Sequence, residues 1–167
     1  MQDIIQLQRA TIAEHIQAEN IKDWFAVYDT FIQKEEAYYD VAPFATRFQG
    51  FSGVKNFYQV FTAAVPDFQV LVTGEYDTLG CSIREVTITG THQGEYCGVP
   101  ARGNSVCVEL AAFYFFCTGE NVDKLVAERI YFDNEILLRQ MRGEADVRTG
   151  IGLAKLPQAA LQPIAYI

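Results

Sequence analysis

The chain is short of the residues that build metal centres and redox sites. It contains 2 histidines and 4 cysteines, and no two of the cysteines, at positions 81, 97, 107 and 117, have C-x-x-C spacing. Zinc-binding and thioredoxin-like motifs need closely spaced ligands or thiols, so neither is present. We therefore expect no bound metal, and we expect the cysteines to be free thiols packed as small apolar side chains.

Positive charge and long apolar runs are also scarce. The 13 basic residues stand against 21 acidic ones, which gives a net charge of −8. Without a basic stripe, the chain is not expected to bind nucleic acid or an anionic membrane surface. It has no basic N-terminal segment followed by an apolar run, and no stretch long enough to span a membrane. These absences predict a cytoplasmic protein.

Hydrophobic and aromatic residues are plentiful, at 50% and 13% of the chain. Such a composition argues against disorder, and 167 residues suit one domain. No repeat or linker interrupts residues 1–143, which we expect to form that domain. Residues 144–167 differ, because they carry no charge after Lys155 and end in IAYI. We expect this apolar tail to dock on the body or on a second subunit.

The hydrophobic period changes along the chain. Apolar residues recur at intervals of three and four within residues 5–16, 24–31 and 54–65, which predicts amphipathic helices. From position 67 onward the period becomes two, in the runs FQVLVTGEY, SIREVTITGTHQGEY, SVCVELAAFYFF and VDKLVAERIYFD. The short break CTGEN joins the last two runs as an antiparallel hairpin. This order predicts an α+β fold with helices packed on one face of a bent antiparallel sheet.

Three stretches together resemble the SnoaL-like polyketide cyclases, or ester cyclases, of the nuclear transport factor 2-like superfamily. They are HIQAENIKDWFAVYDTF (15–31), GTHQGEYCGVPARG (90–103) and ERIYFDNEILLRQMRG (128–143). The resemblance implies a cone-shaped fold with a deep apolar pocket, a homodimer formed through the sheet, and a small apolar or aromatic substrate. It also implies cofactor-free ring closure of a polyketide ester by intramolecular aldol condensation. The alternatives are a non-catalytic binding or dimerisation module, or an isomerase, dehydratase or hydrolase that uses the same carboxylate.

Asp133 is the candidate acid–base residue that this resemblance implies, because it stands near the end of the last long strand. The local sequence gives a second interpretation. Asp133 directly precedes NEILLRQM, which has helical spacing, and aspartate is a favoured N-cap. One carboxylate oxygen can cap a helix while the other faces a pocket, so both roles remain open.

Strand alternation suggests further pocket residues. In an unbroken strand, Arg129, Tyr131 and Asp133 share one face. Closure of the hairpin near 118–121 would place Arg129 opposite residue 109 or 111, so we expect a buried Glu109–Arg129 pair beneath Tyr131. The alternative is that Glu109 and Arg129 point to solvent or to a dimer interface.

Four more residues are candidates for the pocket. His92 follows an apolar face of its strand and is either a core residue or a pocket residue. His15 lies one helical turn before Glu19, so it forms either an i, i+4 pair or a pocket contact. Trp24 and Tyr28 belong to an apolar helix stripe that fills the core or lines the cavity.

Overall fold

The computed structural model describes residues 2–144. Its α-helices are α1 (Gln2–Ile21), α2 (Trp24–Asp29), α3 (Gly50–Ala64) and α4 (Asn134–Arg142). Its strands are β1 (Tyr38–Val41), β2 (Thr46–Gln49), β3 (Gln69–Thr78), β4 (Cys81–Thr91), β5 (Ser105–Phe116) and β6 (Leu125–Phe132). Short 3₁₀ turns, η1 (Ala42–Phe44) and η2 (Gly119–Asn121), complete the set. The predicted docking of the apolar tail falls on residues 145–167, which lie outside the described residues.

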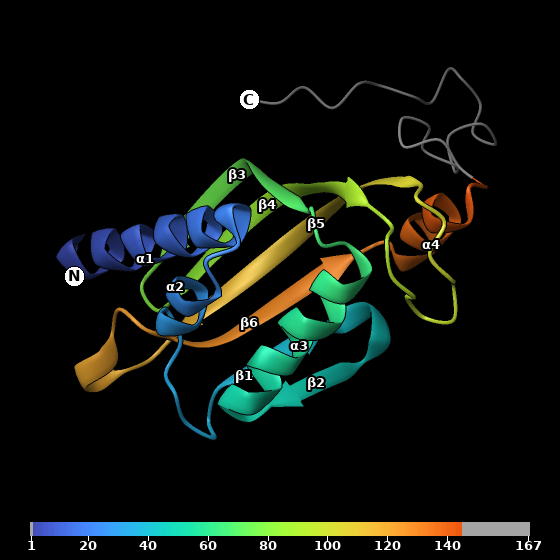
Figure 1. Cartoon of the computed structure of the whole chain (residues 1–167). Coiled ribbons are helices and arrows are strands. Elements are labelled where there is room, and N and C mark those ends of the chain that lie inside the picture. The colour runs from blue at the N-terminus through green and yellow to red at the C-terminus, as the bar shows by residue number, and fades with distance from the viewer. Residues whose placement is uncertain (1, 145–167) are drawn as a thin grey trace, which may run out of the picture.

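The strands form one curved sheet in the order β2-β1-β6-β5-β4-β3. All neighbouring strands are antiparallel except β1 and β6, which are parallel. Helices α1, α2 and α3 lie on one side of this sheet, and α4 follows the end of β6 (Figure 1). The predicted α+β architecture is confirmed. No helix among residues 2–144 combines the length and apolar character needed to cross a membrane.

The hydrophobic stripe of α3 shows why this helix packs on the sheet. Val54 and Tyr58, four residues apart, are 0% and 2% exposed. Phe57 and Phe61 are partly buried against the same core. A single face of the helix therefore carries its apolar side chains, as the 3.6-residue period requires.

The register of the β5–β6 hairpin decides which residues face inward. Phe113 pairs with Arg129, and the register shifts between Phe115 and Phe116. Up to this shift, the even-numbered residues of both strands, such as Tyr114 and Glu128, point to the face covered by the helices, which we call the inner face. The odd-numbered residues, such as Glu109 and Tyr131, point to the outer face.

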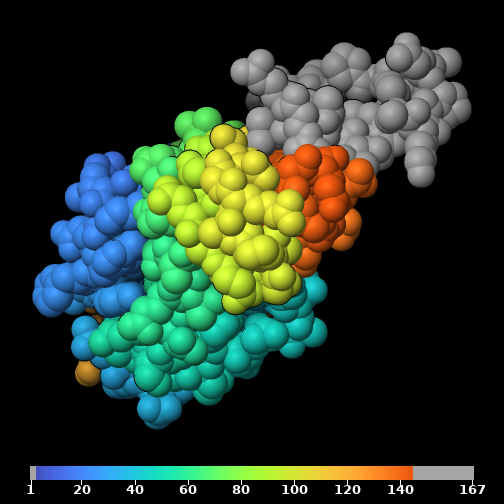
Figure 2. Space-filling view, turned by 45° about the vertical axis from the view of Figure 1, so that its right-hand side comes forward, coloured from blue at the N-terminus to red at the C-terminus, as the bar shows by residue number. Residues whose placement is uncertain are grey.

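The segment between β4 and β5, residues 92–104, is anchored at both ends. The backbone N–H groups of Gln93 and Gly94 donate to the carbonyl of Ala64 at the end of α3. The side chain of Asn104 donates to the carbonyl of Met141 in α4. Figure 2 shows this segment, in yellow, between the green of α3 and the orange of α4. It thereby closes one side of the space between the helices and the sheet.

Candidate active site

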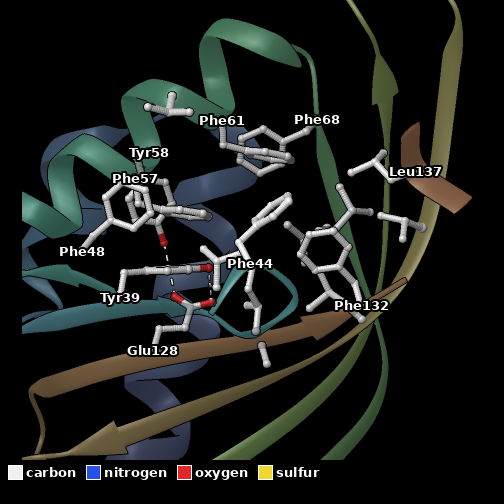
Figure 3. Close-up of a pocket in the computed structure, with 18 of the residues that line it drawn as sticks. Tyr39, Phe44, Phe48, Phe57, Tyr58, Phe61, Phe68, Glu128, Phe132 and Leu137 are labelled. Atoms are coloured by element: carbon white, nitrogen blue, oxygen red, sulfur yellow. Dashed lines mark hydrogen bonds between the residues drawn. The ribbon is translucent and has the colours of Figure 1, made fainter. Parts of the chain in front are cut away.

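A cavity of about 320 Å³ lies between α3, the inner face of the sheet and the 92–104 segment (Figure 3). Its wall is mostly aromatic and aliphatic, and it includes Phe44, Phe48, Phe57, Phe61, Phe68, Val86, Ile88, Tyr96, Val108, Leu110, Ile130, Phe132 and Leu137. Four exposed residues, Thr46, Val60, Glu95 and Cys97, also line it, so the cavity opens to solvent beside them. A pocket with this wall suits a small apolar or aromatic molecule.

The buried polar groups of the cavity gather at its closed end, whereas Thr46 and Glu95 lie at its opening. Tyr39 donates its hydroxyl hydrogen to Oε1 of Glu128 over 2.9 Å. Tyr58 donates to Oε1 of Glu19 over 2.8 Å and lies 3.4 Å from Oε2 of Glu128. Both tyrosines point toward the Glu128 carboxylate in Figure 3. His15 lies behind Tyr58, with Nε2 3.0 Å from the tyrosine hydroxyl oxygen. We call His15, Glu19, Tyr39, Tyr58 and Glu128 the floor cluster.

The floor cluster joins residues that are far apart in sequence. The helix α1 contributes His15 and Glu19, one turn apart, so both point to the same side of the helix. The helix α3 contributes Tyr58, β1 contributes Tyr39, and β6 contributes Glu128 from its inner face. All five are less than 9% exposed. A buried carboxylate persists only where hydrogen bonds and opposite charge compensate for the lost water, and the cluster supplies both.

Burial and charge shift the pKa values of these groups strongly. Burial raises the pKa of Glu128, while its hydrogen bond to His15 and the charge of that ring oppose the rise. Burial alone lowers the pKa of His15, but the charge of Glu19 and the hydrogen bond to Glu128 raise it to about 10. Glu128 thus has the elevated pKa that a general acid–base residue needs.

The phenols of the cluster are hydrogen-bond donors at neutral pH. Burial raises the pKa of Tyr39, Tyr58 and Tyr114 well above the ordinary value for tyrosine, and the charge of Glu128 adds to this effect. Tyr114 also lines the cavity and is 2% exposed. Its hydroxyl makes no hydrogen bond within residues 2–144, so it is available to a bound molecule.

His15, Glu19 and Glu128 are also close enough to share a metal ion, because one ligand atom of each lies within 4.8 Å of the others. The hydrogen bonds of His15 disfavour metal coordination by this residue. Its Nε2 faces the hydroxyl of Tyr58, and its pKa of about 10 means that a metal must compete with a tightly held proton. The donor set therefore fits a proton-sharing network better than a metal centre.

Asp133 caps α4, as predicted. Its Oδ1 accepts a hydrogen bond from the backbone N–H of Ile136 over 3.0 Å. The side chain is exposed, and the cavity is lined by its neighbour Phe132 instead. No observation tests a catalytic role for Asp133, which stays a prediction, but the cavity does not reach it.

The predicted Glu109–Arg129 pair is wrong. The turn between β5 and β6 is centred later in the chain than expected, and the register shifts beside Phe116, so Arg129 pairs with Phe113. Its guanidinium instead binds Asp40, with 2.9 Å between Nη2 and Oδ2. Arg129, Glu109 and Tyr131 lie on the outer face of the sheet rather than in the cavity, and Tyr131 is 46% exposed.

Of the remaining four predicted pocket residues, His15 belongs to the floor cluster, and the other three pack outside the cavity wall. His92 is fully buried outside the cavity wall, and neither ring nitrogen has a hydrogen-bond partner within the described chain. Trp24 and Tyr28 pack against the ring of Tyr58, with centroids 5.6 and 6.0 Å away, and do not line the cavity. The expected His15–Glu19 pair is confirmed, at 3.4 Å between Nε2 and Oε1.

Sequence reasoning missed Glu128, Tyr39 and Tyr58 as site residues. Glu128 alternates with Arg129 in the strand, and a charged residue is normally assigned to the solvent face. Tyr58 was recognised only as part of an apolar stripe. The available signal was that Glu128 shares a strand face with Ile130 and Phe132, but it was not decisive, because the opposite face also carries one charged residue, Arg129, among apolar ones.

Comparison with known proteins agrees with the architecture. No curated protein matches the chain. A candidate SnoaL-like polyketide cyclase from Jannaschia sp. CCS1 superposes with a TM-score of 0.73 at 16% identity, over 86% of this chain and 95% of that one. AclR, a candidate hydroxylase from Streptomyces galilaeus, gives 0.69 at 20% identity, over 83% and 98%. An NTF2-like protein of unknown function from Burkholderia pseudomallei gives 0.66 at 13% identity, over 81% and 97%.

These structural similarities show a shared nuclear transport factor 2-like fold. The family itself is shown by the sequence, which matches the SnoaL-like polyketide cyclases over residues 7–141, well over half of the chain. The chain belongs to the SnoaL-like polyketide cyclase family.

Proposed function

We propose that the protein is a cofactor-free enzyme in which Glu128 performs acid–base catalysis on a small apolar or aromatic substrate. The reaction we favour is intramolecular aldol cyclisation of a polyketide-type ester. One observation carries the proposal: a buried carboxylate with a raised pKa lines the closed end of a cavity whose wall is otherwise mostly apolar.

The chemistry follows from the geometry of the floor. A carbon between two carbonyl groups is acidic enough for a carboxylate base, provided that the base is positioned and partly desolvated. The ionised form of Glu128 would take that proton, and Tyr114 could donate a hydrogen bond to the enolate oxygen. The new carbon–carbon bond leaves an alkoxide, to which protonated Glu128 would return the proton. The apolar wall keeps water away from the intermediate.

A probe reaction tests this proposal. The substrate is a 7-aryl-3,7-dioxoheptanoate ester, a 1,5-diketone whose carbon 2 lies between two carbonyl groups. Aldol attack of carbon 2 on carbon 7 and loss of water give a cyclohexenone, which is followed by its ultraviolet absorbance. Glu128→Gln should lower kcat about 10²–10⁴-fold, whereas Asp133→Asn, which keeps a capping oxygen, should retain the activity. If Asp133→Asn lost activity while Glu128→Gln kept it, Asp133 and not Glu128 would be the acid–base residue. Saturable binding of the probe without turnover by the wild-type protein would favour a non-catalytic binding module.

We also propose that the protein forms a homodimer through the outer face of the sheet. This face carries the aromatic side chains of Phe113 and Tyr131, whose rings lie 5.5 Å apart, and Tyr131 is 46% exposed. Burial of this apolar surface would favour association. Phe113→Lys should shift the sedimenting species from dimer to monomer, while Gln59→Lys, at an exposed position of α3, should not. A monomeric wild-type protein would contradict the proposal.

We further propose that the protein works in the cytoplasm. All four cysteines are free thiols, three of them half-buried. Free thiols suit a reducing compartment. Fractionation of cells that produce the untagged protein would test this expectation.

A further inference from the structure

The protons on the ring of His15 can be assigned from its hydrogen-bond partners. Its Nδ1 lies 2.9 Å from the hydroxyl oxygen of Thr30. That hydroxyl donates its single hydrogen to the carbonyl of Val27 over 2.7 Å. Because the hydrogen of Thr30 is already committed, its oxygen can only accept from His15. The Nδ1 atom therefore carries a proton.

The second ring nitrogen faces an oxygen that is committed in the same way. Nε2 of His15 lies 3.0 Å from the hydroxyl oxygen of Tyr58. Tyr58 donates its hydrogen to Glu19 over 2.8 Å, and burial keeps its phenol protonated by raising its pKa. The Tyr58 oxygen must then accept from Nε2, which also carries a proton. A histidine that is protonated on both nitrogens is an imidazolium cation.

The positive charge lies beside both carboxylates of the floor. Nε2 is 3.4 Å from Oε1 of Glu19 on α1 and 3.5 Å from Oε2 of Glu128 on β6. The ring is 0% exposed, so solvent screens these interactions very little. Within residues 2–144, no other cationic side chain lies within 4.0 Å of either carboxylate. The other groups facing the ring are neutral: Thr30, Phe31, Tyr58 of α3 and Tyr114 of β5.

We propose that His15 is a positioning residue: it stays an imidazolium beneath the cavity floor, and its charge allows Glu128 to ionise there while Glu19 is also charged. Two carboxylates that share a buried site cannot readily ionise together without such a cation. His15 does not line the cavity, so it acts through Glu128 and not on the substrate. This role rests on the proposed function of Glu128, but the charge state of His15 can be measured without any substrate.

Nitrogen NMR of the untagged protein, labelled with [¹⁵N]histidine, measures that charge directly. The chain contains 2 histidines, so the spectrum has two ring systems, and Tyr58→Phe should perturb the one that belongs to His15. At about pH 8, well above the ordinary histidine pKa of 6.5, both nitrogens of His15 should still be protonated. A neutral His15 tautomer at this pH would overturn the proposal, whether or not the protein proves to be an enzyme.

A matched pair of variants at Thr30 tests whether the charge of His15 controls the ionisation of Glu128. Thr30→Val removes the acceptor for Nδ1–H of His15 and should disfavour the imidazolium, whereas Thr30→Ser keeps a hydroxyl. With ¹³C-labelled glutamate, the carboxyl titration of Glu128 should move to higher pH in Thr30→Val and stay in place in Thr30→Ser. In the diketone assay, the acid limb of the kcat–pH profile should move in the same direction, with KM unchanged. A Glu128 titration that is identical in both variants and in wild type would overturn the coupling.

Discussion

The buried imidazolium of His15 predicts an unusual dependence of stability on pH. The pKa of His15 is about 10 in the folded protein, against 6.5 in the unfolded chain. Between these values the folded state holds a proton that the unfolded state has released. The stabilisation that His15 contributes should therefore be fully present below about pH 6.5 and be lost as pH rises towards 10.

The size of the effect follows from the linkage relation. One proton contributes up to about 1.4 kcal/mol per pH unit, so His15 alone should lower the free energy of unfolding by about 1.5 kcal/mol between pH 6.5 and pH 8. Glu128 acts in the same direction, because its pKa is also raised in the folded state. The shifted thiols of Cys81, Cys97 and Cys117 have ordinary values near 9.0 and contribute little below pH 8.

Urea denaturation followed by the fluorescence of Trp24 provides the assay. Trp24 is the single tryptophan, and its ring lies 5.6 Å from that of Tyr58, so it reports on the packing beside the floor cluster. The fall in stability with pH should be smaller in His15→Gln and unchanged in the exposed control variant Asp133→Asn. A wild-type stability that is constant or rises between pH 6.5 and pH 8 would refute the assignment of the charge.

Three further predictions concern the edges of the site. Asp133→Ala removes the cap contact to Ile136 and should lower the free energy of unfolding by about 1 kcal/mol in thermal melts, while affinity for an apolar probe such as 2-naphthol stays unchanged. Gly94→Ala places a methyl group against the backbone carbonyl of Ala63 and should destabilise the protein by about 1–3 kcal/mol in urea titrations; equal stability would show that the 92–104 segment moves freely. Cys97 is the exposed cysteine at the cavity opening, so a maleimide should label it first and weaken 2-naphthol binding, whereas unchanged affinity would place the entrance elsewhere.

Much of the architecture could be predicted from sequence periodicity. The stripe that includes Val54 and Tyr58 predicts α3, and the alternating runs after position 67 predict the four long strands. These signals are strong because burial on one face imposes a fixed period. The register of β5 and β6 could not be obtained in this way. It depends on η2 and on the irregularity at Phe115 and Phe116, which the length of the turn does not reveal.

The candidate site was harder to predict, for a related reason. Both faces of β6 carry charged and apolar side chains, so alternation cannot tell whether Glu128 or Arg129 points inward. Because Asp133 was expected to enter the pocket, the residues that share its strand face, Arg129 and Tyr131, were assigned to the pocket as well. His15 and Glu19 could be paired by helical spacing, but their meeting with Glu128 depends on tertiary packing between α1 and the sheet.

The central claim is that a small molecule binds in the cavity in contact with Glu128 and not with Asp133. Carboxyl ¹³C NMR of the protein with labelled aspartate and glutamate, titrated with 2-naphthol as an aromatic O–H donor, tests this claim most directly. We expect a saturable shift of the Glu128 carboxyl resonance with the Asp133 resonance unmoved, because the cavity is lined by Glu128 and does not reach Asp133. A shift at Asp133 with Glu128 unchanged would contradict the account.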